Sequence, residues 1–168
     1  PKAGQHLPEV LSTTEIDSII ATIDTSTAKG IRDRAMLETL YSCGLRVSEL
    51  IALRLGDLFF GEGYIRVIGK GDKQRLVPIS TTARNRITEW LDCRDQYAEK
   101  KKSNKAEEKS GNKKRKSKSS DIDTLFLNNR GKALTRVMVF TIIKQAAERA
   151  GIDKPISPHT FRHSFATH

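Results

Sequence analysis

Residues near the C-terminal end of the sequence have types that could bind a phosphate: Ser157-Pro158-His159-Thr160-Phe161-Arg162-His163. Ser157 can cap a helix, and Pro158 suits the first position of that helix. On such a helix His159 and Arg162 are three residues apart and share a face, with His163 one turn after His159. A helix N-terminus favours anions, and this one would add a fixed cation and an imidazole that titrates near neutral pH. The spacing therefore predicts part of a phosphate site.

A second candidate for phosphate chemistry is Arg46, in the segment Gly44-Leu45-Arg46-Val47-Ser48-Glu49-Leu50. Gly44 suits the end of one helix, and a short helix is expected to begin near Arg46. Two interpretations are open for this arginine. It is either an exposed residue paired with Glu49, which contributes little, or a buried guanidinium fork that binds phosphate while Glu49 holds it.

A third candidate is Lys70, which lies between two glycines where a turn is expected. The residues around it predict a small antiparallel sheet with strands at 59–60, 64–68 and 75–79. A lysine at the tip of a hairpin can reach a ligand, although a lysine in a turn is usually no more than a solvated residue. The run Gly-Lys-Gly-Asp-Lys lacks the spacing of a nucleotide-binding loop, so we reject an ATPase.

The elements that must position these candidates are mainly helices. Ser12 or Thr13 starts the first helix, with Glu15 placed as in a capping box, and residues 31–43 have the periodicity of the second. Another helix is expected after residues 80–82, and Thr135 caps a long one. The expected fold class is therefore α+β, mainly helical with a small antiparallel three-stranded sheet.

Positive charge is concentrated in one tract of the chain. The formal net charge is +10, and residues 98–120 alone hold ten Lys and Arg against three Glu. The tract has almost no apolar residues, so it predicts a disordered insertion over 99–120. Such a tract is more often a solvated loop than a binding element, and whether it binds a polyanion stays open. Order is expected to resume at residues 123–127, as a short buried strand.

The composition argues against several other classes of protein. No run of about 18 apolar residues is present, so no membrane-spanning helix is predicted. Residues 1–10 do not have the pattern of a secretory signal. Cys43 and Cys93 have neither metal-site spacing nor the pattern of a disulfide framework, so a reduced intracellular compartment is expected.

The three motifs, taken in order, closely resemble the catalytic domain of tyrosine recombinases of the phage integrase family, nearest to the bacterial XerC/XerD type. The matching residues are 44–50, then 67–71 with 75–78, then 157–168. The resemblance covers residues 7–168 apart from the lysine-rich tract. Each motif is modest by itself, whereas the three in this order are specific.

The resemblance implies a role for each candidate. Arg46 and Arg162 would be the two active-site arginines, with His159 beside the second and Lys70 on the hairpin. Two charged forks suit the negative charge that builds on a DNA phosphodiester under attack. Lys70 would protonate the leaving 5′-oxygen, and His159 would bond the phosphate or manage the proton of the nucleophile.

The resemblance also implies supporting residues and partners. Glu49 would orient Arg46, and His163 would support the site from behind. No cofactor and no metal are implied, because the arginines stabilise the charge. The implied reaction is site-specific DNA recombination through a 3′-phosphotyrosine intermediate. Its partners would be double-stranded DNA and further recombinase protomers in a tetramer, in the bacterial cytoplasm at the nucleoid.

The sequence departs from the family pattern at both ends. Residues 1–10 resemble an interdomain linker, and 11–168 a partial catalytic domain with an insertion at 99–120. The tyrosine nucleophile of the family follows the second arginine motif, and we expect none of Tyr41, Tyr64 or Tyr97 to replace it. We therefore expect a fragment that is inactive by itself, monomeric and without membrane contacts.

Three other functions stay open at this point. A type IB topoisomerase-like enzyme would share the arginine, lysine and histidine set. A non-catalytic DNA-binding module would need only the basic surface. A zinc helix could use His159 and His163, but Thr160 stands where a zinc protease has its catalytic glutamate.

Overall fold

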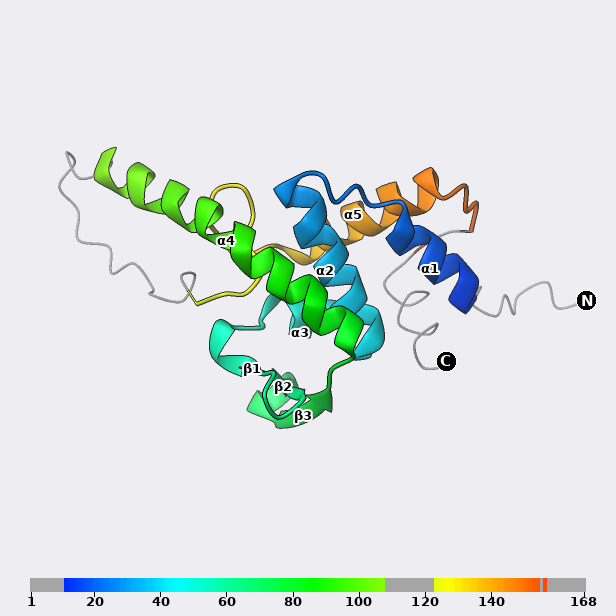
Figure 1. The fold of residues 1–168 in the computed structure, drawn as a ribbon, viewed down its shortest axis with the longest axis horizontal. Coiled ribbons are helices and arrows are strands. Elements are labelled where there is room, and N and C mark those ends of the chain that lie inside the picture. Colours follow the sequence, from blue (N-terminus) through cyan, green and yellow to red (C-terminus); the bar gives the residue numbers. More distant parts are fainter. Residues whose placement is uncertain (1–10, 108–122, 155, 157–168) are drawn as a thin grey trace, which may run out of the picture.

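The computed structural model describes residues 11–107, 123–154 and 156, and the side chains of all of these except 98–107. Within them it contains five α-helices and one sheet (Figure 1). The helices are α1 (Thr13–Ala21), α2 (Ala28–Ser42), α3 (Val47–Ile51), α4 (Thr81–Glu107) and α5 (Arg136–Arg149). The expected α+β class, mainly helical, is confirmed.

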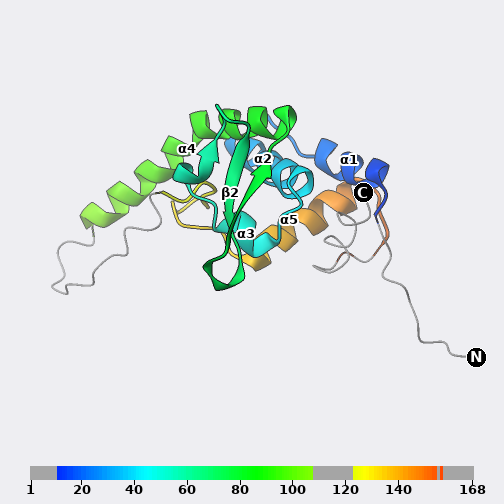
Figure 2. The same ribbon diagram turned by 90° about the horizontal axis from the view of Figure 1, so that it is seen from below.

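The sheet is antiparallel, with the strands in the order β1 (Leu58–Phe59), β2 (Tyr64–Ile68) and β3 (Gln74–Pro78). Ile65 pairs with Val77 and Val67 with Arg75, so these side chains share the inner face. In Figure 1 the sheet lies below the helices, and Figure 2 shows the turn between β2 and β3 beside α3. The predicted hairpin is therefore confirmed.

Local signals explain where the helices begin. Ser12 and Glu15 form the predicted capping box at the start of α1. Thr135 accepts a hydrogen bond from the backbone N–H of Met138 at the start of α5. The helix α2 begins earlier than residue 31, because Thr27 caps it.

The hydrophobic core includes the inner faces of α2 and α4. The side chains of Met36, Leu37 and Leu40 on α2 are fully buried, and so is Trp90 on α4. Residues 125–127 are also buried, as predicted, but they form no strand. The segment makes only isolated bridges, between Arg54 and Thr124 and between Leu127 and Ala133.

Side-chain donors explain why the predicted strand at 123–127 does not form. Trp90 Nε1 donates to the Leu125 carbonyl at 2.8 Å, and Arg94 Nη2 donates to the Thr124 carbonyl at 2.6 Å. Arg32 Nη1 donates to the Leu127 carbonyl at 3.2 Å. These buried donors occupy the carbonyls that a neighbouring strand would otherwise use.

The helix α4 extends into the lysine-rich tract. Disorder was expected from residue 99, but α4 continues to Glu107, and residues 108–122 lie outside the described part of the chain. Alanine, glutamate and lysine, which dominate residues 98–107, are good helix formers, and adding turns to an existing helix needs no new nucleation. The scarcity of apolar residues in this tract means that it cannot form a core, but it does not prevent the tract from extending a helix.

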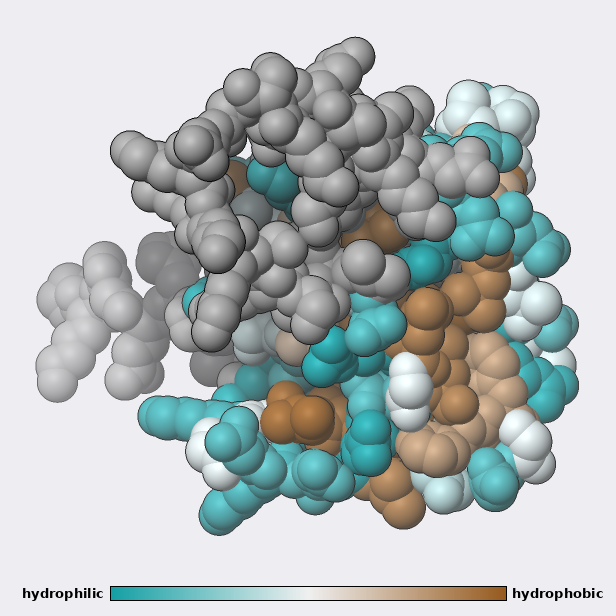
Figure 3. All heavy atoms as spheres, turned by 90° about the vertical axis from the view of Figure 1, so that its left-hand side faces the viewer, coloured by the Kyte–Doolittle hydropathy of each residue, from teal (hydrophilic) through white to brown (hydrophobic). Residues whose placement is uncertain are grey.

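The described surface exposes few large hydrophobic side chains. No helix in the described ranges is both long and apolar enough to cross a membrane. Among the same residues, Ile68, Leu76 and Val137 are the large hydrophobic side chains that are exposed. On the face of the molecule that lies to the left in Figure 1, hydrophobic residues form a band bordered by hydrophilic ones (Figure 3).

Candidate functional site

The segment that carries Arg46 connects α2 to α3. Gly44 has a φ of 62°, so it adopts the left-handed conformation that ends α2. Leu45 and Leu50 are buried on either side of Arg46, which is the N-cap residue of α3. The Arg46 side chain is exposed. The hydrophobic neighbours therefore fix the backbone of Arg46 and leave its guanidinium in solvent.

Glu49 does not bind the guanidinium of Arg46. The backbone N–H of Arg46 donates to Glu49 Oε1 at 2.9 Å, and the carboxylate forms a two-pronged ion pair with the guanidinium of Arg75. Each interpretation of Arg46 is therefore wrong in one part: the guanidinium is exposed and not buried, and the ion-pair partner of Glu49 is Arg75 and not Arg46. Glu49 accepts a hydrogen bond from the backbone of Arg46, and the guanidinium of Arg75 on β3 neutralises the negative charge of Glu49.

The ion pair keeps Glu49 ionised. Burial by itself would raise the pKa of Glu49, but the hydrogen bonds from Arg75 and from the Arg46 N–H, together with the charges of both arginines, lower it below its usual value. The hydrogen bond to Glu49 raises the pKa of Arg75. This part of the site therefore stays charged on both sides at neutral pH.

Lys70 lies in a tight turn between β2 and β3. Residues Lys70–Asp72 form one 3₁₀ turn, which the hydrogen bond from the Gly69 N–H to the Lys73 carbonyl closes at 2.8 Å. Gly71 has a φ of 75°, a conformation that suits glycine. The Lys70 side chain is exposed. Its ammonium is therefore carried on a short, closed loop.

One cavity of about 610 Å³ brings the predicted Arg46 and Lys70 together. Its lining residues come from the start of α3 and from the β2–β3 hairpin: Gly44, Arg46, Glu49, Gly69, Lys70, Lys73, Gln74 and Arg75. Four cations and one carboxylate give the lining a formal net charge of +3. Among the described residues no carboxylate pairs with the guanidinium of Arg46 or the ammonium of Lys70. The cavity therefore suits an anion.

Sequence reasoning missed Lys73 and Arg75 as lining residues. A usable signal existed for Arg75, because strand alternation places it on the same face as Val77, toward the core. An arginine on an inner face needs a buried partner. The other predicted site residues, His159, Arg162 and His163, lie outside the described part of the chain.

The tyrosines of the chain lie elsewhere. Tyr41 and Tyr97 pack against the hydrophobic core, and the ring of Tyr97 lies 5.4 Å from that of Trp90. The ring of Tyr64 lies 5.2 Å from that of Phe59. No tyrosine is among the described residues that line the cavity.

Comparison with known proteins confirms the resemblance. The model of the phage integrase family matches residues 9–168. The chain is 43% identical over 169 residues to the tyrosine recombinase XerD of Listeria innocua, covering 100% of the chain and 51% of the relative. It is 42% identical over 168 residues to XerD of Pseudomonas putida, covering 100% and 50%. The chain thus spans about half the length of these relatives.

Solved structures agree with this assignment. The crystal structure of XerA recombinase superposes with a TM-score of 0.74 at 30% identity, covering 99% of the chain and 51% of that protein. XerH site-specific recombinase bound to its palindromic difH substrate superposes with a TM-score of 0.73 at 27% identity, covering 99% and 43%. The catalytic core of lambda integrase, at 17% identity and a TM-score of 0.58, shares the fold and covers 94% and 81%.

Proposed function

The chain belongs to the phage integrase family, and on this premise we propose that it activates a DNA phosphodiester for site-specific recombination. The observation that carries the proposal is the cavity in which Arg46 and Lys70 meet. A phosphodiester gains negative charge on its non-bridging oxygens when a nucleophile attacks the phosphorus. A guanidinium with no carboxylate partner among the described residues is suited to stabilise that charge.

Each residue has one task in this proposal. A tyrosine hydroxyl attacks the phosphorus, loses its proton and forms a 3′-phosphotyrosine bond. The bond to the 5′-oxygen breaks, and Lys70 gives that oxygen a proton. Arg46 binds the non-bridging oxygens, and Glu49 holds the backbone of Arg46. His159 and Arg162, supported by His163, complete the charge stabilisation and manage the proton of the nucleophile.

The attacking tyrosine is proposed to come from sequence outside this chain. The positions of the three tyrosines support this, because two pack on the core and the third lies against Phe59. We propose that double-stranded DNA is the substrate, bound in bacteria by a tetramer of the protein that contains this chain. The chain alone is proposed to be an inactive monomer.

The decisive experiment is a covalent-adduct assay. The complete open reading frame that contains this chain is incubated with a nicked suicide duplex, whose sequence has been selected from randomised DNA for binding to that protein. A protein–DNA adduct that survives a denaturing gel is expected. Arg46→Ala should slow formation of the adduct by about 100-fold or more, because the charge on the phosphate is no longer balanced.

Matched controls separate chemistry from binding. Arg54→Ala removes an exposed arginine that does not line the cavity, and the adduct should persist. Selected DNA that is bound but gives no adduct would identify a non-catalytic binding module. Relaxation of supercoiled plasmid without strand exchange would instead support a topoisomerase. An adduct formed by the printed chain alone would show that one of its own residues is the nucleophile.

A further inference from the structure

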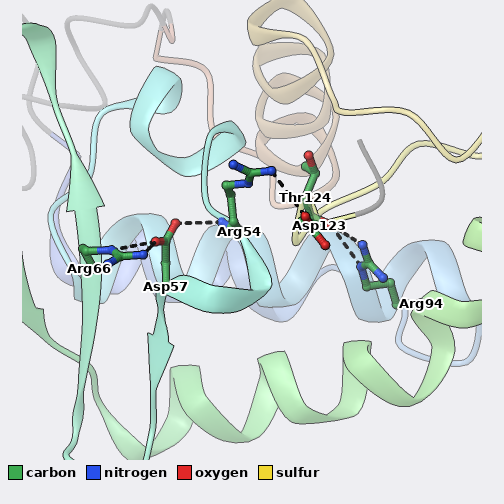
Figure 4. A network of polar contacts seen from close by, with 6 residues as sticks. All are labelled: Arg54, Asp57, Arg66, Arg94, Asp123 and Thr124. Carbon is green, nitrogen blue, oxygen red and sulfur yellow. Dashed lines mark hydrogen bonds and ion pairs between the residues drawn. The ribbon is translucent and has the colours of Figure 1, made fainter. Parts of the chain in front are cut away.

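Two arginines of the sheet pair with buried carboxylates, Arg75 through both oxygens of Glu49 and Arg66 through one oxygen of Asp57. Arg75 on β3 pairs with Glu49, whose carboxylate also accepts the backbone N–H of Arg46. Arg66 on β2 pairs with Asp57, whose carboxylate also accepts the backbone N–H of Arg54 at 3.0 Å (Figure 4). We call these the Arg75 clamp (Arg75, Glu49 and the Arg46 N–H) and the Arg66 clamp (Arg66, Asp57 and the Arg54 N–H).

The two clamps are closely matched in their surroundings. The side chains of Glu49 and Asp57 are 4% and 3% exposed, and those of Arg75 and Arg66 are 46% and 36% exposed. Both carboxylates lie three residues after the N-cap of a short helical turn. They differ in location, because Arg75 and Glu49 line the cavity whereas Arg66 and Asp57 do not.

The turn that carries Lys70 rests on the Arg75 clamp. A Cβ atom added to Gly69 would lie 3.4 Å from Glu49 Oε2, 3.7 Å from the Lys73 carbonyl oxygen and 3.8 Å from Arg75 Nη1. Gly69 therefore lies beside the ion pair, and Lys70 is the next residue. The same carboxylate touches the backbone of Arg46 on its other side. One ion pair thus connects the two cations of the site.

We propose that Arg75 is a positioning residue, which holds the β2–β3 turn against α3 so that the Lys70 ammonium faces the same phosphate as Arg46. This inference rests on the proposed function and adds a residue to it. Arginine suits the task because its planar fork binds both carboxylate oxygens and fixes an orientation, which a lysine cannot do. Without the clamp the turn stays closed by its own hydrogen bond but loses its attachment to α3.

The test compares two leaving groups in the adduct assay with the complete open reading frame. One suicide duplex has the natural 5′-oxygen at the scissile phosphate, and the other has a bridging 5′-sulfur. A thiol has a pKa of about 8.5, so its thiolate leaves without a general acid, whereas an alkoxide needs the proton. A defect in the placement of Lys70 should therefore slow cleavage of the oxygen substrate only.

The expected results differ from variant to variant. Lys70→Ala should slow the oxygen substrate by about 10²- to 10⁴-fold and be largely rescued by sulfur. Arg75→Ala should slow it by about 10- to 100-fold, the cost of a misplaced group, and show the same rescue. Arg75→Lys should behave like Arg75→Ala. Arg46→Ala should be slow on both substrates, because the charge it balances is present in both.

The Arg66 clamp supplies the control for loosening of the sheet. Arg66→Ala removes an ion pair to a similarly buried carboxylate, together with a contact on the Phe59 ring, so it should lower the melting temperature at least as much as Arg75→Ala does, but it should slow neither substrate.

Other outcomes would overturn the proposal. An Arg75→Ala defect that is equal on both substrates would mean that Arg75 binds the phosphate or only stabilises the fold. An Arg75→Lys protein with normal rates would mean that charge alone matters. Sulfur rescue of a slow Arg66→Ala protein would show general loosening of the sheet. A wild-type protein that forms no adduct with either duplex would contradict the proposed function itself.

Discussion

Glu49 is a buried carboxylate whose two partners come from different parts of the chain, the backbone of Arg46 and the guanidinium of Arg75. Its pKa is lowered in the folded state, since the hydrogen bonds and positive charges outweigh the effect of burial. A carboxylate of this kind stabilises the fold above its unfolded pKa, and the contribution disappears as the pH falls through the folded pKa. The Arg75 clamp should therefore weaken in acid.

Glu49→Gln should lower the free energy of unfolding by about 1–2 kcal/mol at pH 7, a value reduced because Arg75 is half-exposed. The difference from the wild type should shrink as the pH falls below about 4.5, because the unfolded chain binds a proton at Glu49 there first, and it should disappear once the folded carboxylate is also protonated. Urea unfolding of the chain at pH 7 and at pH 3 measures both values.

The comparison with the wild type isolates Glu49 from the other acidic residues. Burial raises the pKa of Asp33, despite the nearby Arg32, so Asp33 has the opposite pH dependence, and it is common to both proteins. Glu62→Gln, at an exposed position in the β1–β2 turn, should change stability at neither pH. A difference for Glu49→Gln that stays constant with pH would show that its charge does not stabilise the fold.

At the scale of the element, the start of α2 depends on a glycine in its first turn. Thr27 caps the helix by accepting the backbone N–H of Gly30 at 3.1 Å. A Cβ atom on Gly30 would lie 1.5 Å from the carbonyl oxygen of Asp24. No side chain fits there unless the turn before α2 moves.

Gly30→Ala should therefore destabilise the chain by about 2 kcal/mol or more, because steric overlap outweighs the gain of about 1 kcal/mol in helix propensity. Gly56→Ala is the matched control, since nothing lies within 4 Å of its added Cβ atom. It should change the free energy of unfolding by less than about 1 kcal/mol. Urea unfolding measures both, and a Gly30→Ala protein as stable as the wild type would contradict the packing described here.

At the scale of the whole molecule, residues 123–127 form hydrogen bonds with α2, with α4 and with the segment that follows α3. Two arginines hold this segment from different sides (Figure 4). Arg94 is buried and donates to the Thr124 carbonyl, whereas Arg54 pairs with Asp123 and is about half-exposed. The Arg94 contact should contribute much more to the free energy of unfolding than the Arg54 contact, because a buried carbonyl that loses its donor cannot bond to water instead.

Arg94→Met should cost about 2–3 kcal/mol in unfolding free energy, because it leaves the Thr124 carbonyl without these bonds. Arg54→Met should cost at most about 0.5 kcal/mol, as is usual for an exposed ion pair. Amide hydrogen exchange at Leu125, whose N–H donates to the Leu53 carbonyl, gives a local readout. Equal effects of the two variants on this exchange would disprove the ranking.

The sequence by itself was enough for features that depend on near neighbours. Ser12 with Glu15, Thr135 and Gly44 mark helix ends because each acts on backbone groups within a few residues. The hairpin around Lys70 follows from strand alternation and its flanking glycines. The three motifs, which contain Arg46, Lys70 and Arg162, were together enough to identify the family, since their order along the chain is itself informative.

Only the tertiary structure decided which distant groups meet. The partner of Glu49 is Arg75, which is 26 residues away in the sequence and meets Glu49 only because β3 packs against α3. The state of residues 123–127 depends on side chains of α2 and α4, which take the carbonyls that a strand would use. Local patterns report what a segment can form, whereas packing decides which partner satisfies each buried charge and carbonyl, because several partners are chemically equivalent until the chain is folded.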